Sequence, residues 1–340
     1  MIPTESILDL ATISRSPAGD DTHAEAQARA LQASIDLATT AERVGYERIW
    51  YAEHHNMSTI ASSAPAVLIA AVGAHTQRIK LGSGGVMLPN HAPLTVAEQF
   101  GTLAALYPGR IELGLGRAPG TDHKTMRALR RDPRSADSFP QDVQELRGYL
   151  NDETVIAGIN ATPGRGTQVP LYILGSSLFG AQLAAALGLP YAFASHFAPD
   201  AMLAAIAAYR EQFSPSEQLD RPLAFAAMNV ITAETEEDAQ RQHFISRRNL
   251  VRSFLSRNPL GGTRRLSDEE AEALMDTPQG RQVQHMFRHT AVGTVAQVRE
   301  QLSEFGAYST ADQLIVAHQS PEVADRLRSV ELTAAAAGLS

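Results

Sequence analysis

The chain has 340 residues, no cysteine and a formal net charge of −8 at pH 7, and 44% of its residues are hydrophobic. This length exceeds that of an average domain but suits one barrel with insertions, so we expect a single domain over residues 1–340. The acidic balance without a basic cluster argues against nucleic-acid binding, and no stretch is long and apolar enough to span a bilayer. The absence of cysteine excludes disulfides, thiolate catalysis and cysteine metal sites. The N-terminal residues show no secretory signal pattern, so we expect a cytoplasmic protein.

Short apolar runs alternate with segments of helical periodicity along the whole chain. We expect strands at residues 7–13, 47–52, 79–88, 111–115, 171–174, 189–194, 223–231 and 313–316. We expect helices at residues 23–44, 65–75, 93–107, 141–150, 177–187, 201–213, 236–254, 294–305 and 321–337. Repeated strand–helix units indicate a parallel sheet, and eight of them predict a (β/α)8 TIM barrel of the α/β class.

A doubly wound open sheet is the main alternative fold, and one glycine pair could suggest it. Gly114 and Gly116 resemble the start of a dinucleotide-binding fingerprint, but Pro119 stands where the third glycine belongs. A helix that began at the second glycine would run into this proline. The barrel is therefore the preferred prediction.

Two segments fall outside the strand–helix alternation and are predicted as insertions at the C-terminal face of the barrel. Residues 122–134 are charged and polar, and we expect them to cross the barrel mouth. Residues 256–290 are polar and rich in Gly, Asn and Pro, which is typical of a mobile insertion.

The ends of the fourth and fifth predicted strands both suit an anion. Arg117 follows the fourth strand among glycines, and its guanidinium could bind a phosphate in a bidentate manner or pair locally. Gly175, Ser176 and Ser177 open the next helix, where free amides and the helix dipole attract anions. One serine can be explained by helix capping alone, but Gly175 leaves room for a ligand. Since neighbouring strands carry both features, phosphate binding is the preferred interpretation.

Histidines follow the second and sixth strands, where a barrel carries its active site. His54 and His55 are adjacent, so only one can face the barrel axis, and a single inward histidine suits proton transfer. Glu53 and His55 could share a face, but two ligands make a weak metal site, so we expect no metal. His196 could line the same mouth or pack as an ordinary loop residue.

The third strand contains Gly82, Gly84 and Gly85. Glycines inside a buried strand mark either a bulge or a surface that a ligand approaches closely. A flat ring system lying on the backbone would need such a bare surface.

These motifs, taken together, resemble the bacterial luciferase-like flavin monooxygenases. The similar segments are YAEHHN (51–56), LGSGGVMLPNHAPLTVAEQF (81–100), PGRIELGLGRAPGTD (108–122), LGSSLFGAQLAAALGLPYAFASHF (174–197) and HTAVGTVAQVREQL (289–302). The resemblance covers nearly the whole chain and is strongest to the single-chain oxidoreductase branch. Where the light-emitting subunit carries a reactive cysteine, this chain has Gly116, so bioluminescence is not implied.

The resemblance implies a TIM barrel that binds reduced FMN from a separate flavin reductase. The flavin would react with O2 to form a C4a-peroxide that oxygenates a small substrate such as an aldehyde. His54 matches the catalytic histidine of the family, and Arg117, Ser176 and Ser177 match contacts of the FMN phosphate, with Gly175 beside them. Gly84 and Gly85 match a non-prolyl cis peptide beside the isoalloxazine ring.

The resemblance leaves the substrate open and suggests where it could bind. Substrate-pocket candidates are His55, His196 and Asp122, which lies near an acidic residue of the family. A homodimer is expected by similarity. The alternative functions are hydride transfer with F420, a non-catalytic flavin-binding protein and, last, a metal-dependent barrel hydrolase.

Overall fold

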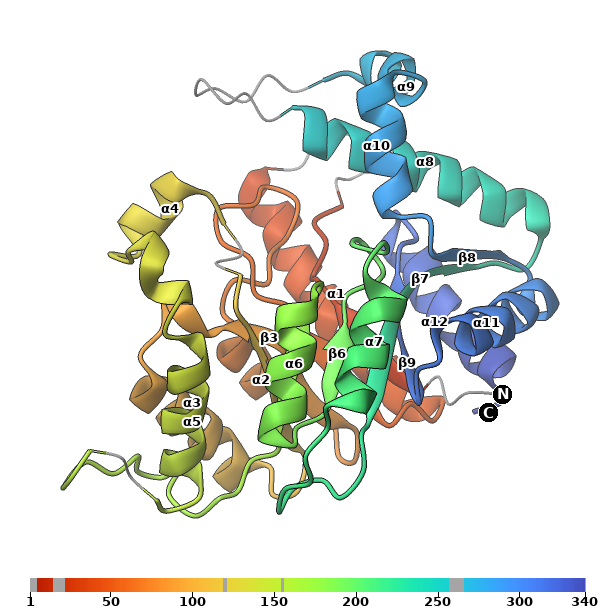
Figure 1. Ribbon diagram of the computed structural model, residues 1–340. Coiled ribbons are helices and arrows are strands. Elements are labelled where there is room, and N and C mark those ends of the chain that lie inside the picture. The colour runs from red at the N-terminus through yellow and green to blue at the C-terminus, as the bar shows by residue number, and fades with distance from the viewer. Residues whose placement is uncertain (1–4, 15–21, 119–120, 154–155, 257–265, 340) are drawn as a thin grey trace.

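Eight parallel strands form a closed barrel at the centre of the molecule, and helices surround it (Figure 1). The computed structural model describes residues 5–14, 22–118, 121–153, 156–256 and 266–339. Around the barrel the strands follow the order β1, β2, β3, β4, β5, β6, β7 and β9, and β9 pairs with β1 to close it. This confirms the predicted (β/α)8 TIM barrel.

The strands agree with the predicted positions, apart from β8, to within a few residues at their ends. They are β1 (Ser6–Asp9), β2 (Arg48–Tyr51), β3 (Lys80–Met87), β4 (Ile111–Gly116), β5 (Leu171–Gly175), β6 (Tyr191–Phe193), β7 (Ala224–Thr232), β8 (Thr290–Gly293) and β9 (Gln313–His318). The helices are α1 (His23–Arg43), α2 (Pro65–Gly73), α3 (Pro93–Leu106), α4 (His123–Ala128), α5 (Phe139–Leu150), α6 (Leu178–Leu187), α7 (Met202–Glu211), α8 (Glu236–Leu255), α9 (Asp268–Met275), α10 (Pro278–Met286), α11 (Val295–Ser309) and α12 (Val323–Ala337).

β8 is an additional strand that lies beside the barrel. It pairs in parallel with the C-terminal half of β7, from Asn229 with Thr290 to Thr232 with Gly293. The N-terminal half of β7 pairs with β6, and β7 pairs with β9 along its other edge. The sequence predicts no strand here because four residues are too short for an alternating pattern to be distinct.

The segment 256–290 contains the helices α9 and α10, which the sequence did not predict. Ser267 and Thr277 begin these helices, and each side chain accepts a hydrogen bond from an amide in the first turn. Val251, Met275 and Val283 form a small buried cluster that joins them to α8. Residues 257–265 lie outside the described residues, so the mobility of this segment stays a prediction.

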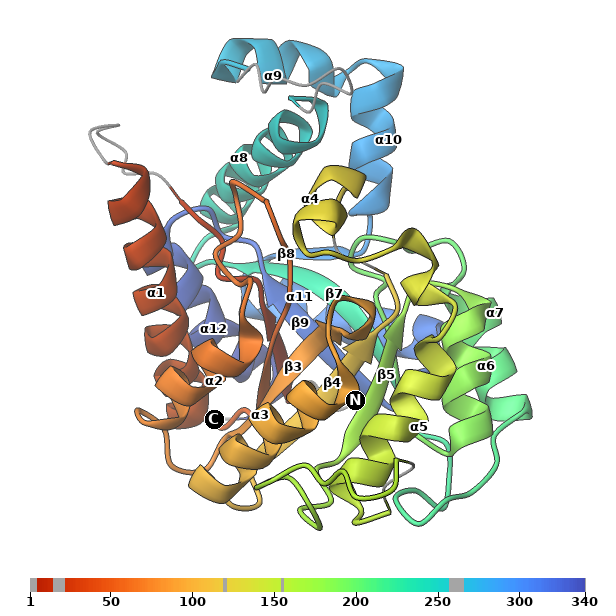
Figure 2. The ribbon, with the colours of Figure 1, turned by 90° about the vertical axis from the view of Figure 1, so that its left-hand side faces the viewer.

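Two different views show α4 at the same end of the barrel as α9 and α10 (Figures 1 and 2). α4 follows β4 and belongs to the charged segment 122–134, which was predicted to cross the barrel mouth. No helix among the described residues is long and apolar enough to cross a membrane.

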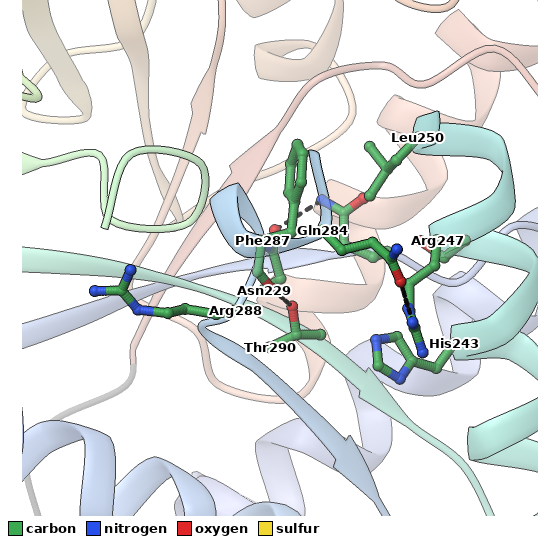
Figure 3. A pocket seen from close by; sticks show the side chains of 10 residues that line it. Asn229, His243, Arg247, Leu250, Gln284, Phe287, Arg288 and Thr290 are labelled. Carbon is green, nitrogen blue, oxygen red and sulfur yellow. Dashed lines mark hydrogen bonds between the residues drawn. The ribbon is translucent and has the colours of Figure 1, made fainter. Parts of the chain in front are cut away.

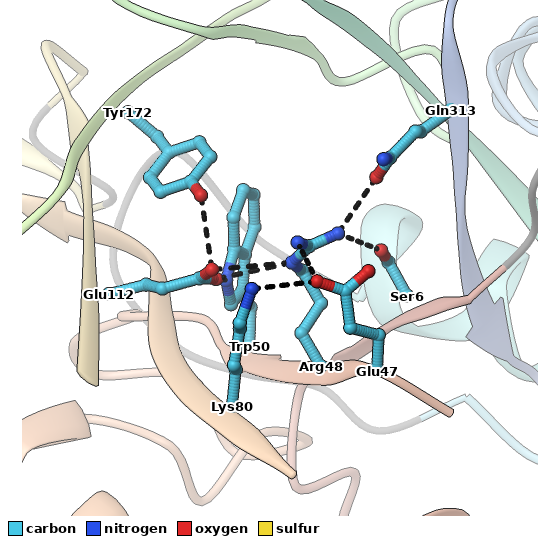
Figure 4. Close-up of polar contacts among 8 residues, drawn as sticks. All are labelled: Ser6, Glu47, Arg48, Trp50, Lys80, Glu112, Tyr172 and Gln313. Carbon is cyan, nitrogen blue, oxygen red and sulfur yellow. Dashed lines mark hydrogen bonds and ion pairs between the residues drawn. The ribbon is translucent and has the colours of Figure 1, made fainter. Parts of the chain in front are cut away.

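A buried ion pair lies inside the barrel near the N-terminal ends of the strands (Figure 4). Arg48 Nε lies 3.2 Å from Glu112 Oε2, and both side chains are buried. Trp50 Nε1 donates to the same Glu112 oxygen at 2.7 Å, and the Tyr172 hydroxyl donates to Glu112 Oε1 at 3.0 Å. Arg48 Nη1 also donates to Gln313 at 2.7 Å. Arg48 is on β2 and Gln313 is on β9, so the network links strands on either side of β1, where the barrel closes.

We expect Arg48→Met to destabilise the fold strongly. The substitution leaves the Glu112 carboxylate buried without its cation, which costs about 3–5 kcal/mol of unfolding free energy. Urea denaturation measures this loss. Arg43→Met is the matched control, because Arg43 pairs with Glu331 at the surface, where ion pairs contribute little. A loss no larger than that of the control would contradict a structural role for the network.

His318, the last residue of β9, is buried, and its Nδ1 lies 3.0 Å from Ser329 Oγ. Burial, together with the charge of Arg326, lowers the pKa of His318 to about 3. An unfolded histidine takes up a proton below about pH 6.5. The unfolded state therefore binds more protons than the folded state as the pH falls from there, and the free energy of unfolding decreases.

We expect the wild-type protein to lose stability between pH 7 and pH 5, and His318→Asn to lose less. One buried neutral histidine contributes a slope of up to about 1.4 kcal/mol per pH unit below its unfolded pKa. Denaturant unfolding at several pH values measures the slope. His75→Asn, at an exposed position after α2, should keep the wild-type slope. Equal slopes in wild type and His318→Asn would show that His318 does not cause the loss of stability at low pH.

Candidate active site

Arg117 and the start of α6 lie together at the C-terminal ends of β4 and β5, which pair in parallel. The guanidinium carbon of Arg117 stacks 4.1 Å from the centroid of the Phe179 ring, and Phe179 is in the first turn of α6. The structure therefore brings Arg117 beside the helix N-terminus. Pro119 and Gly120 of the same loop lie outside the described residues.

The N-terminus of α6 leaves hydrogen-bonding groups available. Ser177 occupies the N-cap position in an extended conformation, but its side chain makes no capping hydrogen bond. Ser176, Ser177 and Arg117 are exposed. A Cβ atom at Gly175 would meet its nearest neighbours at 3.5 Å, an ordinary contact, so packing does not require glycine there. This rim thus presents a cation, two hydroxyls and free amides to an anion.

The glycines of β3 have a packing reason. The pairing of β3 with β4 shifts register between Ser83 and Val86, and the Gly84–Gly85 peptide is cis. A Cβ atom at Gly84 would lie 2.8 Å from Leu8 Cδ1, and one at Gly85 would lie 2.8 Å from the Gly114 carbonyl oxygen. The irregular strand and its close packing explain both glycines without a ligand. Their proposed place beside a flavin ring stays a prediction.

His54 follows β2 and His196 follows β6, and the two imidazoles are close enough for the charge of one to act on the other. His196 follows β6 and is buried, and its Nδ1 has no hydrogen-bond partner among the described residues. Burial, and secondarily the charge of His54, lowers the pKa of His196 to about 4. Asn229 Nδ2 donates to the His196 carbonyl at 2.7 Å and holds this loop. The pair therefore offers a half-buried imidazole, His54, beside one that stays neutral at neutral pH.

His55 points to a different cluster, as the alternation of the strand end predicts. Glu53 Oε1 lies 2.7 Å from His55 Nε2 and 2.7 Å from His91 Nε2, and Glu53 Oε2 accepts the Met87 amide at 3.1 Å. These contacts lower the pKa of the Glu53 carboxyl, although its burial acts to raise it.

Glu53, His55 and His91 have ligand atoms within 4.8 Å of one another, so a third candidate metal ligand exists. The sequence missed His91 because it follows β3, 38 residues after Glu53. Both oxygens of Glu53 already accept hydrogen bonds, and the cluster is satisfied as a hydrogen-bonded group. The expectation of no metal stays a prediction.

Asp122 has a local structural role. It is exposed and begins α4, where its Oδ1 accepts the Thr125 amide at 2.8 Å. This capping bond lowers the pKa of the Asp122 carboxyl. A contact with a substrate stays a prediction for this residue.

A cavity of about 250 Å³ lies between α8, α10 and the strands β7 and β8 (Figure 3). The sequence pointed to none of its residues, because they come from four separate parts of the chain. Its lining consists of Asn229, His243, Ser246, Arg247, Leu250, Gln284, Phe287, Arg288, Thr290 and Gln319. Asn229 also donates to the backbone carbonyl of His196, so one wall of the cavity is hydrogen-bonded to the loop after β6.

The chain is similar to known proteins over most of its length. A luciferase-like monooxygenase of Escherichia coli (strain K12) is 44% identical over 336 residues, which cover 96% of this chain and 95% of that protein. The N-acetyl-S-alkylcysteine monooxygenase of Bacillus subtilis (strain 168) is 35% identical over 72% of each chain. The crystal structure of apo-MsnO8 matches with a TM-score of 0.86 and 36% identity, over 100% of this chain and 99% of that one.

Two more distant structures share the fold. The oxygenating constituent of 3,6-diketocamphane monooxygenase, in complex with FMN, matches with a TM-score of 0.65 and 17% identity over 98% of this chain and 96% of that one. An F420-dependent secondary alcohol dehydrogenase, in complex with an F420–acetone adduct, matches with a TM-score of 0.66 and 15% identity over 97% and 98%. Neighbours of this fold thus bind either FMN or F420.

The family model of the luciferase-like monooxygenases matches residues 10–313, which is most of the chain. The chain belongs to the luciferase-like monooxygenase family.

Proposed function

We propose that this protein is an FMN-dependent monooxygenase that uses O2 to oxygenate a small organic substrate such as an aldehyde. One observation carries the proposal: Arg117 stacks on Phe179 directly at the N-terminus of α6, where Ser177 makes no capping bond. A phosphate monoester carries about two negative charges at neutral pH and suits this combination of guanidinium, hydroxyls and free amides.

One group of residues would bind the cofactor, and another would transfer the proton. Arg117, Ser176 and Ser177, with Gly175 leaving space, would hold the FMN phosphate, while the backbone of Gly84 and Gly85 would lie beside the ring. Bound FMN, once reduced, would supply the activation of O2 through a C4a-peroxyflavin. His54 would hold or move a proton next to the neutral His196, and the helices over the mouth would exclude water.

The choice of FMN over F420 rests on the family resemblance, because the cationic rim suits the phosphate of either cofactor. F420-dependent hydride transfer is the alternative, because a neighbour with this fold binds F420. We propose that a separate flavin reductase supplies the reduced FMN. A non-catalytic flavin-binding protein is a further alternative, which the histidine pair beside the phosphate rim disfavours.

The family resemblance is the basis for expecting a homodimer. We propose that two chains pair through α2 and α3 and that the protein is cytoplasmic.

We expect Arg117→Gln to weaken FMN binding about 10- to 100-fold, because a charge-assisted hydrogen bond contributes about 1.5–3 kcal/mol. Riboflavin, which lacks the phosphate, should bind wild type and variant with similar affinity. Quenching of flavin fluorescence measures both constants. The matched control is Arg127→Gln, which changes an exposed arginine on α4 and should leave both unchanged.

Equal losses for FMN and riboflavin in Arg117→Gln would show that Arg117 does not contact the phosphate. A parallel titration with F420 tests the alternative cofactor. Tighter binding of F420 than of FMN by the wild-type protein would overturn the choice of FMN.

We expect His54→Ala to bind FMN with an unchanged dissociation constant but to lose turnover about 100-fold or more, the range for removal of a general acid–base group. The assay supplies a flavin reductase, NADH and O2, and quantifies products from a panel of aldehydes and thioethers. Catalase and a hydrogen peroxide assay separate oxygenation from uncoupled oxidation. Release of hydrogen peroxide alone with every substrate would contradict the monooxygenase function.

A further inference from the structure

Two arginines line the cavity under α8 and α10, and among the described residues only one of them pairs with an acidic side chain. Its lining contains Arg247 and Arg288 but no aspartate or glutamate. Arg288 is paired outside the cavity, with its Nη1 2.6 Å from Asp200 Oδ1. Arg247 instead donates to the neutral side-chain oxygen of Gln284, through Nε at 2.8 Å and through Nη2.

The neighbouring arginines of α8, unlike Arg247, pair with acidic side chains. Arg248 lies 2.8 Å from Asp268 and 2.8 Å from Glu272, and Arg252 also pairs with Asp268. Within the described part of the chain, no carboxylate lies within ion-pair distance of Arg247. A half-buried guanidinium whose hydrogen bonds go to a neutral amide keeps its charge available to an anion.

Gln284 holds the guanidinium in place. Its Nε2 donates to the carbonyl oxygens of Met275 at 2.8 Å and Gly280 at 3.2 Å, so its Oε1 is aimed at Arg247. Figure 3 shows the Arg247 side chain extending from α8 to meet Gln284 on α10. Beside it, burial and the charge of Arg247 lower the pKa of His243 to about 4, so His243 stays neutral and adds no second cation.

The rest of the cavity is suited to an organic group. Leu250 and Phe287 supply apolar surface, and Thr290 and Ser246 supply hydroxyls. Asn229 forms part of the wall and accepts from Gln319 Nε2 at 3.0 Å, while its amide nitrogen bonds to the His196 loop. The wall of the cavity is therefore hydrogen-bonded to the loop that carries His196.

We propose that this cavity binds the carboxylate of a small organic acid and that the substrate of the monooxygenase is such an anion. Arg247 contacts the carboxylate, and Leu250 and Phe287 contact the apolar chain. Asn229, which is hydrogen-bonded to the His196 loop, lies in the same cavity wall. The assignment of this ligand as substrate rests on the proposed function, but the anion site itself does not.

A pair of matched probes tests the site. Hexanoate and hexanamide have nearly the same shape and differ in charge, and ligand-observed NMR titration of the flavin-free protein measures millimolar dissociation constants. We expect wild type to bind hexanoate about tenfold or more tightly than hexanamide, and Arg247→Gln to lose that preference. Arg241→Gln on the same helix is the matched control, because Arg241 pairs with Asp238 away from the cavity and the preference should persist.

Equal binding of the two probes by wild type, or an unchanged preference in Arg247→Gln, would overturn the anion site. A loss of FMN affinity in Arg247→Gln would also overturn it, because the cation would then serve the flavin. Binding of hexanoate without any binding of FMN would reject the proposed function and leave the anion site intact. Unfolding curves of both variants check that each is folded.

Discussion

The hydrogen-bonded closure of the parallel barrel determines where every polar side chain of the proposed site can lie. Pairing of β9 with β1 and of β6 with β7 closes the eight-stranded barrel and brings the C-terminal ends of its strands to one rim. Arg117 and Ser177 are 60 residues apart but adjacent in space, because β4 pairs with β5. The same closure places His54, which follows β2, within electrostatic reach of His196, which follows β6.

The two ends of the barrel use polar residues in different ways. Near the N-terminal ends, Arg48 and Glu112 are buried and each side chain is fully engaged, so their charges hold strands together. At the C-terminal end, Arg117 stacks on an aromatic ring and Arg247 donates to an amide, and neither guanidinium pairs with a carboxylate among the described residues. A satisfied network contributes to stability, whereas an uncompensated cation at a concave rim favours a ligand of opposite charge.

The sequence predicted the parts of the structure that follow from chain order and local pattern. Successive βα units occupy neighbouring positions around a barrel. The proximity of Arg117 and Gly175 could therefore be inferred from the sequence. The pairing of His91 with Glu53 could not be, because it depends on how the turn after β3 folds back over β2. The helices α9 and α10 also escaped prediction, because their polar composition hides a buried cluster of only three residues. The glycines of β3 correctly indicated an irregular backbone. The close approach of the Gly114 carbonyl and the Leu8 side chain explains why glycine stands there, so a bound flavin ring is not needed to explain it.

The order of strands around the barrel also constrains how the proposed ligands could share the mouth. The phosphate rim belongs to β4 and β5, the anion cavity belongs to β7 and the end of β9, and β6 with His196 lies between them. A flavin anchored by its phosphate at one side and a substrate anchored by its carboxylate at the other would have their unanchored ends directed toward the centre. His196 follows β6, between these two sides, and Asn229 donates to its backbone carbonyl from the wall of the cavity at 2.7 Å. Two separate cationic anchors would thus orient two anions without placing their charges in contact, because like charges repel strongly where water is excluded.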